Sequence, residues 1–153
     1  MINFSPRKTV KQIEEGFDLS PKFDQNGLMP CVTTDFQTGE VLMVGYMNEE
    51  ALKKTIETNQ AHYYSRSRKK LWKKGETSGL TQKVGEARID DDQDCLWLRV
   101  SIDEKASCHV GYRSCFYRSI QTSGDRVSLQ FEEKEKSFDP KKVYGNSPNP
   151  TII

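Results

Sequence analysis

Two short segments of the chain hold the side chains best suited to bind metal ions. The first, residues 90–95, is rich in carboxylates, and the second, residues 108–115, begins and ends with cysteine and contains His109. Carboxylate oxygens suit Mg²⁺, Ca²⁺ or Mn²⁺, whereas thiolates suit Zn²⁺. The presence of both ligand sets in one short stretch favours a metal-dependent enzyme.

The acidic segment predicts a site for a hard divalent cation. Asp90, Asp92 and Asp94 alternate, and alternate side chains of an extended segment point the same way. Three carboxylates on one face repel one another unless a cation neutralises them. Asp91 and Cys95 would face the other way. The alternative is a solvated acidic turn between two strands.

The cysteine segment predicts a zinc site less directly. Six residues separate Cys108 from Cys115, which is longer than the spacing of common zinc knuckles, but a loop containing Gly111 can bring both thiolates to one ion. The alternative is two half-buried cysteines at strand ends. His109 is a candidate ligand, a candidate acid–base group or a structural residue.

A basic segment offers a place for phosphate. Residues 66–74 contain six lysines and arginines, and a polar loop follows. Cations with nearby hydroxyl and amide groups can hold phosphate, and Trp72 can stack on a base. The alternative is a solvated strand or a nonspecific RNA patch. The candidate contacts are Arg66, Arg68, Trp72, Lys73, Lys74, Thr77, Ser78 and Gly79.

Composition indicates a single cytoplasmic domain without a membrane or nucleic-acid partner. The 153 residues suffice for one core, and 23 basic against 22 acidic residues give almost no net charge. We find no apolar run that would span a bilayer and no signal peptide. In a reducing compartment the four cysteines, Cys31, Cys95, Cys108 and Cys115, are expected to be thiols or metal ligands.

Local patterns predict an α+β fold that is mainly antiparallel β with two or three helices. Residues 1–26 form an N-terminal helix and arm, with Ser5 as N-cap and Pro6 as first helical residue; residues 27–136 form the catalytic domain, and residues 137–153 an irregular tail. Asn48 caps a second helix. The expected strands are residues 31–36, 41–47, 61–66, 82–89, 96–102, 116–120 and 127–131.

Several longer motifs resemble the phosphoribosyl-AMP cyclohydrolase family. They run in the family's order between about Gly27 and Arg118. The motifs are Gly39-Glu40-Val41-Leu42-Met43 with Tyr46-Met47-Asn48, Ala61-His62-Tyr63-Tyr64-Ser65-Arg66-Ser67-Arg68, Leu71-Trp72-Lys73-Lys74-Gly75-Glu76-Thr77-Ser78-Gly79, and Cys108-His109-x-Gly-x-x-Ser114-Cys115-Phe116.

The resemblance implies hydrolytic opening of the adenine ring of phosphoribosyl-AMP, between N1 and C6, in histidine biosynthesis. It also implies a β pseudo-barrel in an intertwined homodimer, with zinc at the subunit interface and a magnesium site. The family's magnesium positions match Asp90, Asp92 and Asp94, and two of its zinc cysteines match Cys108 and Cys115.

One position departs from the family pattern. The family usually has Asp-Cys-Asp-x-Asp, whose cysteine is the third zinc ligand and comes from the partner subunit, but here that position is Asp91. Asp91 can be an oxygen ligand of zinc. Alternatively Cys95 restores a three-thiolate site, although four residues along a strand are about 13 Å. Both possibilities remain open.

The implied mechanism uses zinc-bound hydroxide as the nucleophile on C6. His109 is the first candidate for proton transfer and His62 the second. Two competing hypotheses are a related enzyme that acts on another purine nucleotide, and a noncatalytic, zinc-stapled module that binds RNA.

Overall fold

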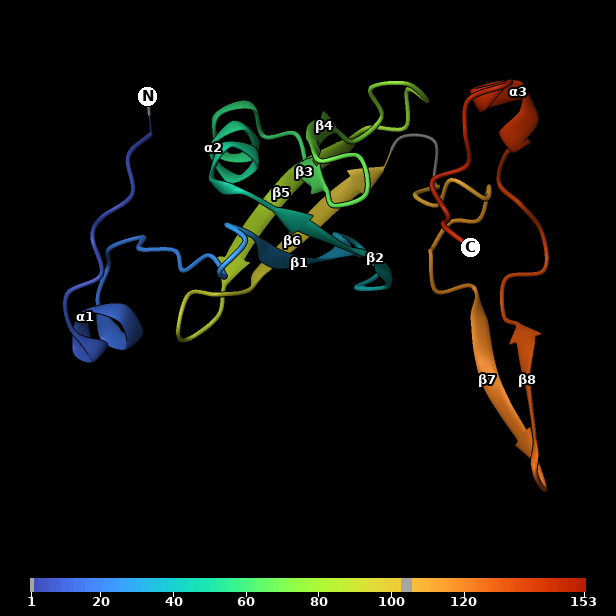
Figure 1. The fold of residues 1–153 in the computed structure, drawn as a ribbon, viewed down its shortest axis with the longest axis horizontal. Helices are drawn as coiled ribbons and strands as arrows, with labels where there is room; N and C mark the ends of the chain where they lie inside the picture. The colour runs from blue at the N-terminus through green and yellow to red at the C-terminus, as the bar shows by residue number, and fades with distance from the viewer. Residues whose placement is uncertain (1, 103–105) are drawn as a thin grey trace.

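The computed structural model describes residues 2–102 and 106–153 and confirms the α+β class. Short helices and a larger number of strands make up these residues (Figure 1). None of the helices in this part of the chain is long and apolar enough to cross a bilayer. The elements are α1 (Val10–Glu15), β1 (Met29–Asp35), β2 (Val41–Met47), α2 (Glu49–Thr58), β3 (His62–Ser65), β4 (Lys70–Lys73), β5 (Gln82–Ile89), β6 (Leu96–Ile102), β7 (Arg118–Ser123), β8 (Arg126–Phe131) and α3 (Pro140–Tyr144).

A four-stranded sheet with the order β2-β1-β6-β5 forms the centre of the protein. The β1–β2 and β5–β6 pairs are antiparallel as predicted, whereas β1 and β6 run parallel. The β3–β4 and β7–β8 pairs form two further small sheets. The described strands do not close into a barrel, so the pseudo-barrel stays a prediction.

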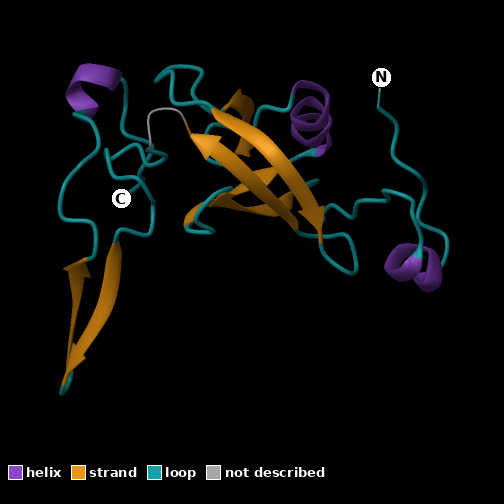
Figure 2. Ribbon diagram, turned by 180° about the vertical axis from the view of Figure 1, so that it is seen from behind, coloured by secondary structure: helices purple, strands orange, loops and turns teal. Residues whose placement is uncertain are grey.

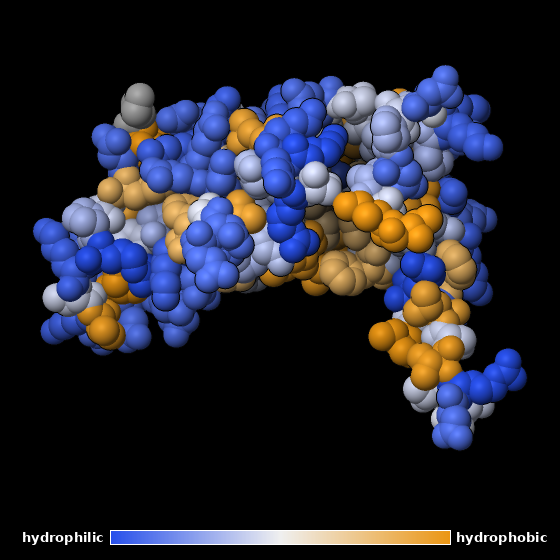
Figure 3. Space-filling model, in the orientation of Figure 1, coloured by the Kyte–Doolittle hydropathy of each residue, from blue (hydrophilic) through white to orange (hydrophobic). Residues whose placement is uncertain are grey.

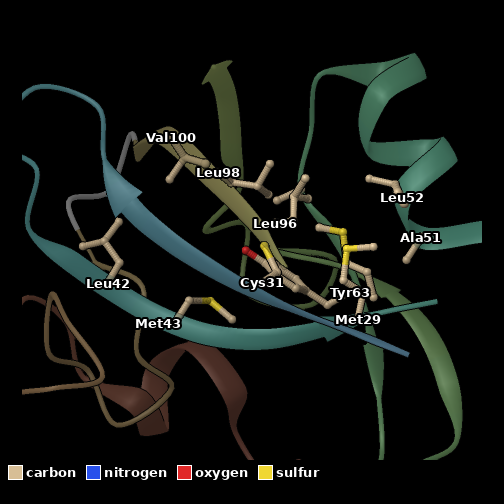
Figure 4. Packing of buried hydrophobic residues seen from close by; sticks show 12 residues of the cluster. Met29, Cys31, Leu42, Met43, Ala51, Leu52, Tyr63, Leu96, Leu98 and Val100 are labelled. Carbon is tan, nitrogen blue, oxygen red and sulfur yellow. The ribbon is translucent and has the colours of Figure 1, made fainter. Parts of the chain in front are cut away.

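One face of the central sheet carries the hydrophobic core. Leu96, Leu98 and Val100 alternate along β6 and are at most 4% exposed. They pack with Leu52 of α2 and with Tyr63 of β3, which close over this face (Figure 4). Strand alternation therefore explains why residues 82–89 and 96–102 were correctly predicted as strands.

Helix α2 forms as its end signals predict. The Asn48 side chain accepts a hydrogen bond from the backbone N–H of Ala51 at 2.8 Å, and Glu49 and Glu50 lie in the first turn. Asn59 ends the helix in the left-handed conformation, with a φ of 54°. The capped helix holds β3 against the sheet.

The N-terminal helix begins later than predicted. Its N-cap is Thr9, whose side chain accepts from the N–H of Gln12, and Ser5 and Pro6 lie outside it. The reason is long-range, because the N–H of Ser5 donates to the carbonyl of Leu19 and keeps this segment out of the helix.

The end of the chain also differs in detail. The last strand pair runs from 118 to 123 and from 126 to 131, so its turn is tighter than expected. The tail contains one helical turn, α3, in which Asp139 is the N-cap and Pro140 the first residue. The prediction of a wholly irregular tail was therefore wrong.

A line of buried hydrogen bonds crosses the core to the segment before Cys108. The Tyr63 hydroxyl donates to Oε1 of Gln82 at 2.6 Å and lies 2.7 Å from the hydroxyl of Thr33. The Gln82 amide in turn donates to the hydroxyl of Ser107 at 2.6 Å. All four residues are at most 1% exposed, so water cannot replace any lost partner.

We expect Tyr63→Phe to destabilise the fold by about 1–3 kcal/mol, because it leaves a buried amide oxygen without a donor. Chemical denaturation of the wild type and the variant measures the difference. Tyr64→Phe, at the neighbouring half-buried position, is the matched control and should be near neutral. Equal stability of Tyr63→Phe and the wild type would contradict the proposed importance of the line.

Candidate functional site

The acidic residues lie in a tight turn between β5 and β6. The backbone N–H groups of Asp94 and Cys95 both donate to Oδ1 of Asp90, at 2.9 and 3.0 Å. Oxygens of Asp90, Asp92 and Asp94 all lie within 4.8 Å of one another. The three carboxylates are thus grouped as expected, but a turn groups them rather than strand alternation.

The neighbouring carboxylates disfavour the ionisation of Asp94. A hydrogen bond with Asp92, some loss of solvent and the charge of Asp90 raise the pKa of Asp94 above its ordinary value. A hard divalent cation would remove this repulsion, and carboxylate oxygens are the donors it prefers. The donor set therefore fits Mg²⁺.

The N-terminal arm holds this turn through Gln93, which is 5% exposed. The Gln93 amide donates to the carbonyls of Ile13 and Asp18, and its oxygen accepts from the N–H of Ser20 at 2.7 Å. Arg7 adds a bond to the carbonyl of Asp92 at 2.9 Å. Residues 7–20 therefore fix the position of the acidic turn.

The two candidate third zinc ligands lie beside the aspartates. Asp91 is exposed. Cys95 is half-buried, and burial together with the charges of Asp90 and Asp94 raises the pKa of its thiol. Strand β6 separates both residues from Cys108, and its seven residues span roughly 23 Å. Within one chain, neither residue reaches the Cys108–Cys115 pair.

The cysteine loop brings the thiols of Cys108 and Cys115 close enough for each to shift the pKa of the other. The N–H of Cys108 donates to the carbonyl of Tyr112, and the N–H of Gly111 donates back to the carbonyl of Cys108, which closes a turn. Gly111 has a φ of 107°, which residues with a Cβ rarely adopt. The glycine therefore permits the predicted approach of the two thiols.

The two thiols shift each other's pKa in opposite directions. A hydrogen bond with Cys115, assisted by the N–H of Val110 and the charge of Lys74, lowers the pKa of Cys108 to about 6. The same hydrogen bond and burial raise the pKa of Cys115. Two neighbouring thiols, one of which ionises readily, are a donor set that fits Zn²⁺.

Ion pairs and backbone bonds attach the cysteine loop to the central sheet. The Arg113 guanidinium lies 2.7 Å from Asp35 and 2.6 Å from Glu40, in the β1–β2 hairpin. The N–H of Cys115 donates to the carbonyl of Leu42 at 2.7 Å. Glu133 accepts from the N–H groups of Arg113 and the following residue. The loop is therefore preorganised.

The two histidines have different surroundings. His109 is half-buried, its Nε2 atom has no hydrogen-bond partner among the described residues, and burial and the charge of Lys74 lower its pKa. A contact with the Asn149 side chain opposes this shift. His62 is 8% exposed, and its Nδ1 lies 2.7 Å from the carbonyl of Gln60. The assignment of proton transfer to either histidine stays a prediction.

The basic segment forms the β3–β4 hairpin and the loop after it. The guanidinium of Arg66 lies 4.0 Å from the ring centre of Tyr46, and that of Arg68 lies 6.0 Å from Trp72. Trp72 also packs on Tyr63, so it is partly a core residue. Lys73 is half-buried, and Thr77, Ser78 and Gly79 lie in the polar loop that follows β4. Lys74 instead points inward.

Sequence reasoning missed Gln93, Gln82 and Arg113 as residues that position the site, and it wrongly assigned Lys74 to phosphate binding. Gln93 lies between Asp92 and Asp94, and the only sign of its role in the sequence is that it is the one amide among carboxylates. Lys74 was part of a charge run, which usually indicates solvated side chains. Gln82 and Arg113 act through partners far away in sequence, so no local pattern identified them.

Comparison with known proteins finds close relatives along most of the chain. The family model described as phosphoribosyl-AMP cyclohydrolase matches residues 43–117. A Rhodopseudomonas palustris (strain TIE-1) protein is 58% identical over 134 residues, covering 87% of this chain and 89% of that protein. A Nitrobacter winogradskyi protein is 52% identical over 92% of this chain and 97% of that protein. Both relatives are named phosphoribosyl-AMP cyclohydrolase.

We expect Mg²⁺ to stabilise the protein through the acidic turn, by about 2.7 kcal/mol at 100 times its Kd. Asp94→Asn should abolish this effect. Because the pKa of Asp94 is raised in the fold, its charge opposes folding above that pKa, so the variant should also be slightly more stable than the metal-free wild type. Thermal melts with and without Mg²⁺ measure both effects.

Asp91→Asn is the matched control, since its carboxylate is outside the group of three. This control should keep the full response to Mg²⁺. An unchanged response in Asp94→Asn would show that the turn does not bind the cation.

Proposed function

The chain belongs to the phosphoribosyl-AMP cyclohydrolase family, and from this premise we propose that it opens the adenine ring of 1-(5-phosphoribosyl)-AMP. The reaction would be hydrolysis of the N1–C6 bond in histidine biosynthesis, to give the formimino-AICAR ribonucleotide. The observation that carries the proposal is the loop that holds Cys108 and Cys115 as neighbours, with the pKa of Cys108 lowered, within the residues that the family model matches.

We propose that Cys108 and Cys115 hold Zn²⁺ together with a third ligand from a partner subunit. Within one chain Asp91 and Cys95 are too far from the pair, which supports a shared site. When bound, zinc would lower the pKa of a water molecule and polarise the reacting centre. An open coordination position would be left for that water.

We propose that His109 transfers the proton in this reaction. Its lowered pKa keeps the imidazole neutral near pH 7, so it can accept a proton, and its Nε2 lacks a partner among the described residues. His62 is the second candidate, although the carbonyl of Gln60 already occupies one of its nitrogens. Full turnover by a His109→Ala protein would remove His109 from the mechanism.

The substrate phosphates are proposed to bind at the β3–β4 hairpin and its following loop. Arg66 and Arg68 offer exposed guanidinium groups held over aromatic rings, which limits their freedom. Lys73, Thr77, Ser78 and Gly79 add donors, and Trp72 offers a ring face. Mg²⁺ at Asp90, Asp92 and Asp94 would bind a phosphate or support the site.

We further propose that the protein is an intertwined homodimer. The β7–β8 hairpin projects from the rest of the chain (Figure 2), and its apolar side chains are visible in Figure 3. Ile120 pairs with Leu129 on one face, where they are 73% and 52% exposed, and Val127 lies beside them. A lone hairpin with an uncovered apolar face is barely stable, so a second copy is the expected cover.

The cytoplasm is the proposed location, since its reducing conditions keep cysteines as thiols. All four cysteines are free in the structure.

The proposed reaction is tested by absorbance during ring opening of phosphoribosyl-AMP with Mg²⁺, before and after zinc chelation. We expect activity to fall by at least an order of magnitude on chelation and to return with zinc. Inactivity of protein that carries zinc would instead favour another purine nucleotide as substrate or a noncatalytic RNA-binding role. Zinc content of Asp91→Ala and Cys95→Ala, prepared separately, identifies the third ligand; zinc retained in both would exclude both.

The shared site predicts that subunit separation releases zinc. The double variant Ile120→Ser/Leu129→Ser should be monomeric by light scattering and should bind zinc at least tenfold more weakly, because it lacks the partner's ligand. Gln121→Ala/Ser128→Ala, a cross-strand pair on the polar face, is the control and should stay dimeric. A monomer with wild-type zinc affinity would show that each chain binds zinc alone.

A further inference from the structure

Lys74 is the only lysine or arginine among residues 2–102 and 106–153 that is buried, with 8% of its surface exposed. Its ammonium donates a hydrogen bond to the carbonyl of Ser107 at 2.6 Å and lies 5.5 Å from the ring centre of Trp72. The other lysines of this basic segment are exposed or only half-buried. Lys74 is therefore held inside the protein rather than offered to solvent.

Among the residues that the structure describes, the buried ammonium has no carboxylate partner. The described residues place no Asp or Glu oxygen within 4.0 Å of it. Its nearby ionisable groups are the thiols of Cys108 and Cys115 and the imidazole of His109, of which only the thiols can carry negative charge. Burying a cation is costly unless negative charge or hydrogen bonds compensate for it, so the thiol pair is its natural counter-charge.

The surrounding structure fixes where this charge lies. The N–H of Lys74 donates to the carbonyl of Ala61, directly after β4. Ser107, which accepts from the ammonium, also accepts from the amide of Gln82. The ammonium is thus tied to the residue that precedes Cys108, through the same buried line that begins at Thr33.

We propose that Lys74 is a positioning residue whose buried ammonium balances the negative charge of the Cys108–Cys115 thiolates when they hold a metal cation. The inference rests on the proposed zinc site. Two thiolates and a third anionic ligand leave a net negative charge around a divalent ion. At Cys108, which is only 3% exposed, this charge is disfavoured without a fixed cation nearby. Phosphate binding would not require an ammonium that is turned inward.

A purely structural lysine would behave differently. If Lys74 only satisfied the carbonyl of Ser107, its loss would lower the stability of the metal-free protein and leave the zinc affinity of the folded protein unchanged. If it balances the thiolates, removal of the charge weakens zinc binding even where the fold is intact. Zinc affinity and metal-free stability therefore separate the two roles.

The test measures zinc affinity of the full chain by competition with a chromophoric chelator, alongside denaturation of the metal-free protein. We expect Lys74→Met and Lys74→Gln to bind zinc roughly 10- to 100-fold more weakly. The amide of Lys74→Gln can still donate to the carbonyl of Ser107. If Lys74→Met does not fold, the zinc affinity of Lys74→Gln therefore tests the proposal. Lys74→Arg, which keeps the charge, should recover much of the affinity.

Lys70→Met is the matched control, since it removes an exposed cation from the same hairpin. It should bind zinc as the wild type does. A folded Lys74→Met or Lys74→Gln protein with wild-type zinc affinity would overturn the inference and leave the proposed zinc site standing. A wild type that binds no zinc would instead overturn the zinc site itself.

Discussion

The buried hydrogen bonds from Thr33 through Tyr63 and Gln82 to Ser107 are the constraint on which the site depends. They join β1, β3 and β5 to the residue before Cys108, and none of their donors has access to water. Unsatisfied polar groups at this depth are costly, so these side chains adopt one arrangement. The hydrogen bonds that fix these core side chains therefore also fix Ser107, where the cysteine loop begins.

The local elements were predictable where local rules decide them. Strands β5 and β6 follow from alternation, and α2 follows from its cap at Asn48. The N-terminal helix was not, because Ser5 bonds to Leu19, a partner that no local pattern indicates. The grouping of three aspartates was correct for a wrong reason, since a turn at Asp90 replaces the assumed extended segment.

The metal-binding side chains of the candidate site can be identified from the sequence, whereas the residues that position them cannot. Residue type alone indicated the thiols and the carboxylates, because few other side chains bind metals. The inward orientation of Lys74 depends on a carbonyl 33 positions later, so its charge run gave no sign of burial. Asp91 and Cys95 lie at the start of β6 and the cysteine loop follows its end, so one chain does not bring them together, and the proposed third zinc ligand depends on a second chain.

The acidic turn accepts few other residues at position 93, because both the backbone and the side chain of Gln93 are constrained. Its φ of 59° suits glycine or asparagine better than glutamine. Glycine, however, has no amide to reach the carbonyls of Ile13 and Asp18, and asparagine is one methylene shorter. Replacement at this position therefore requires the arm to change at the same time, so the arm and the turn are expected to diverge together among related sequences.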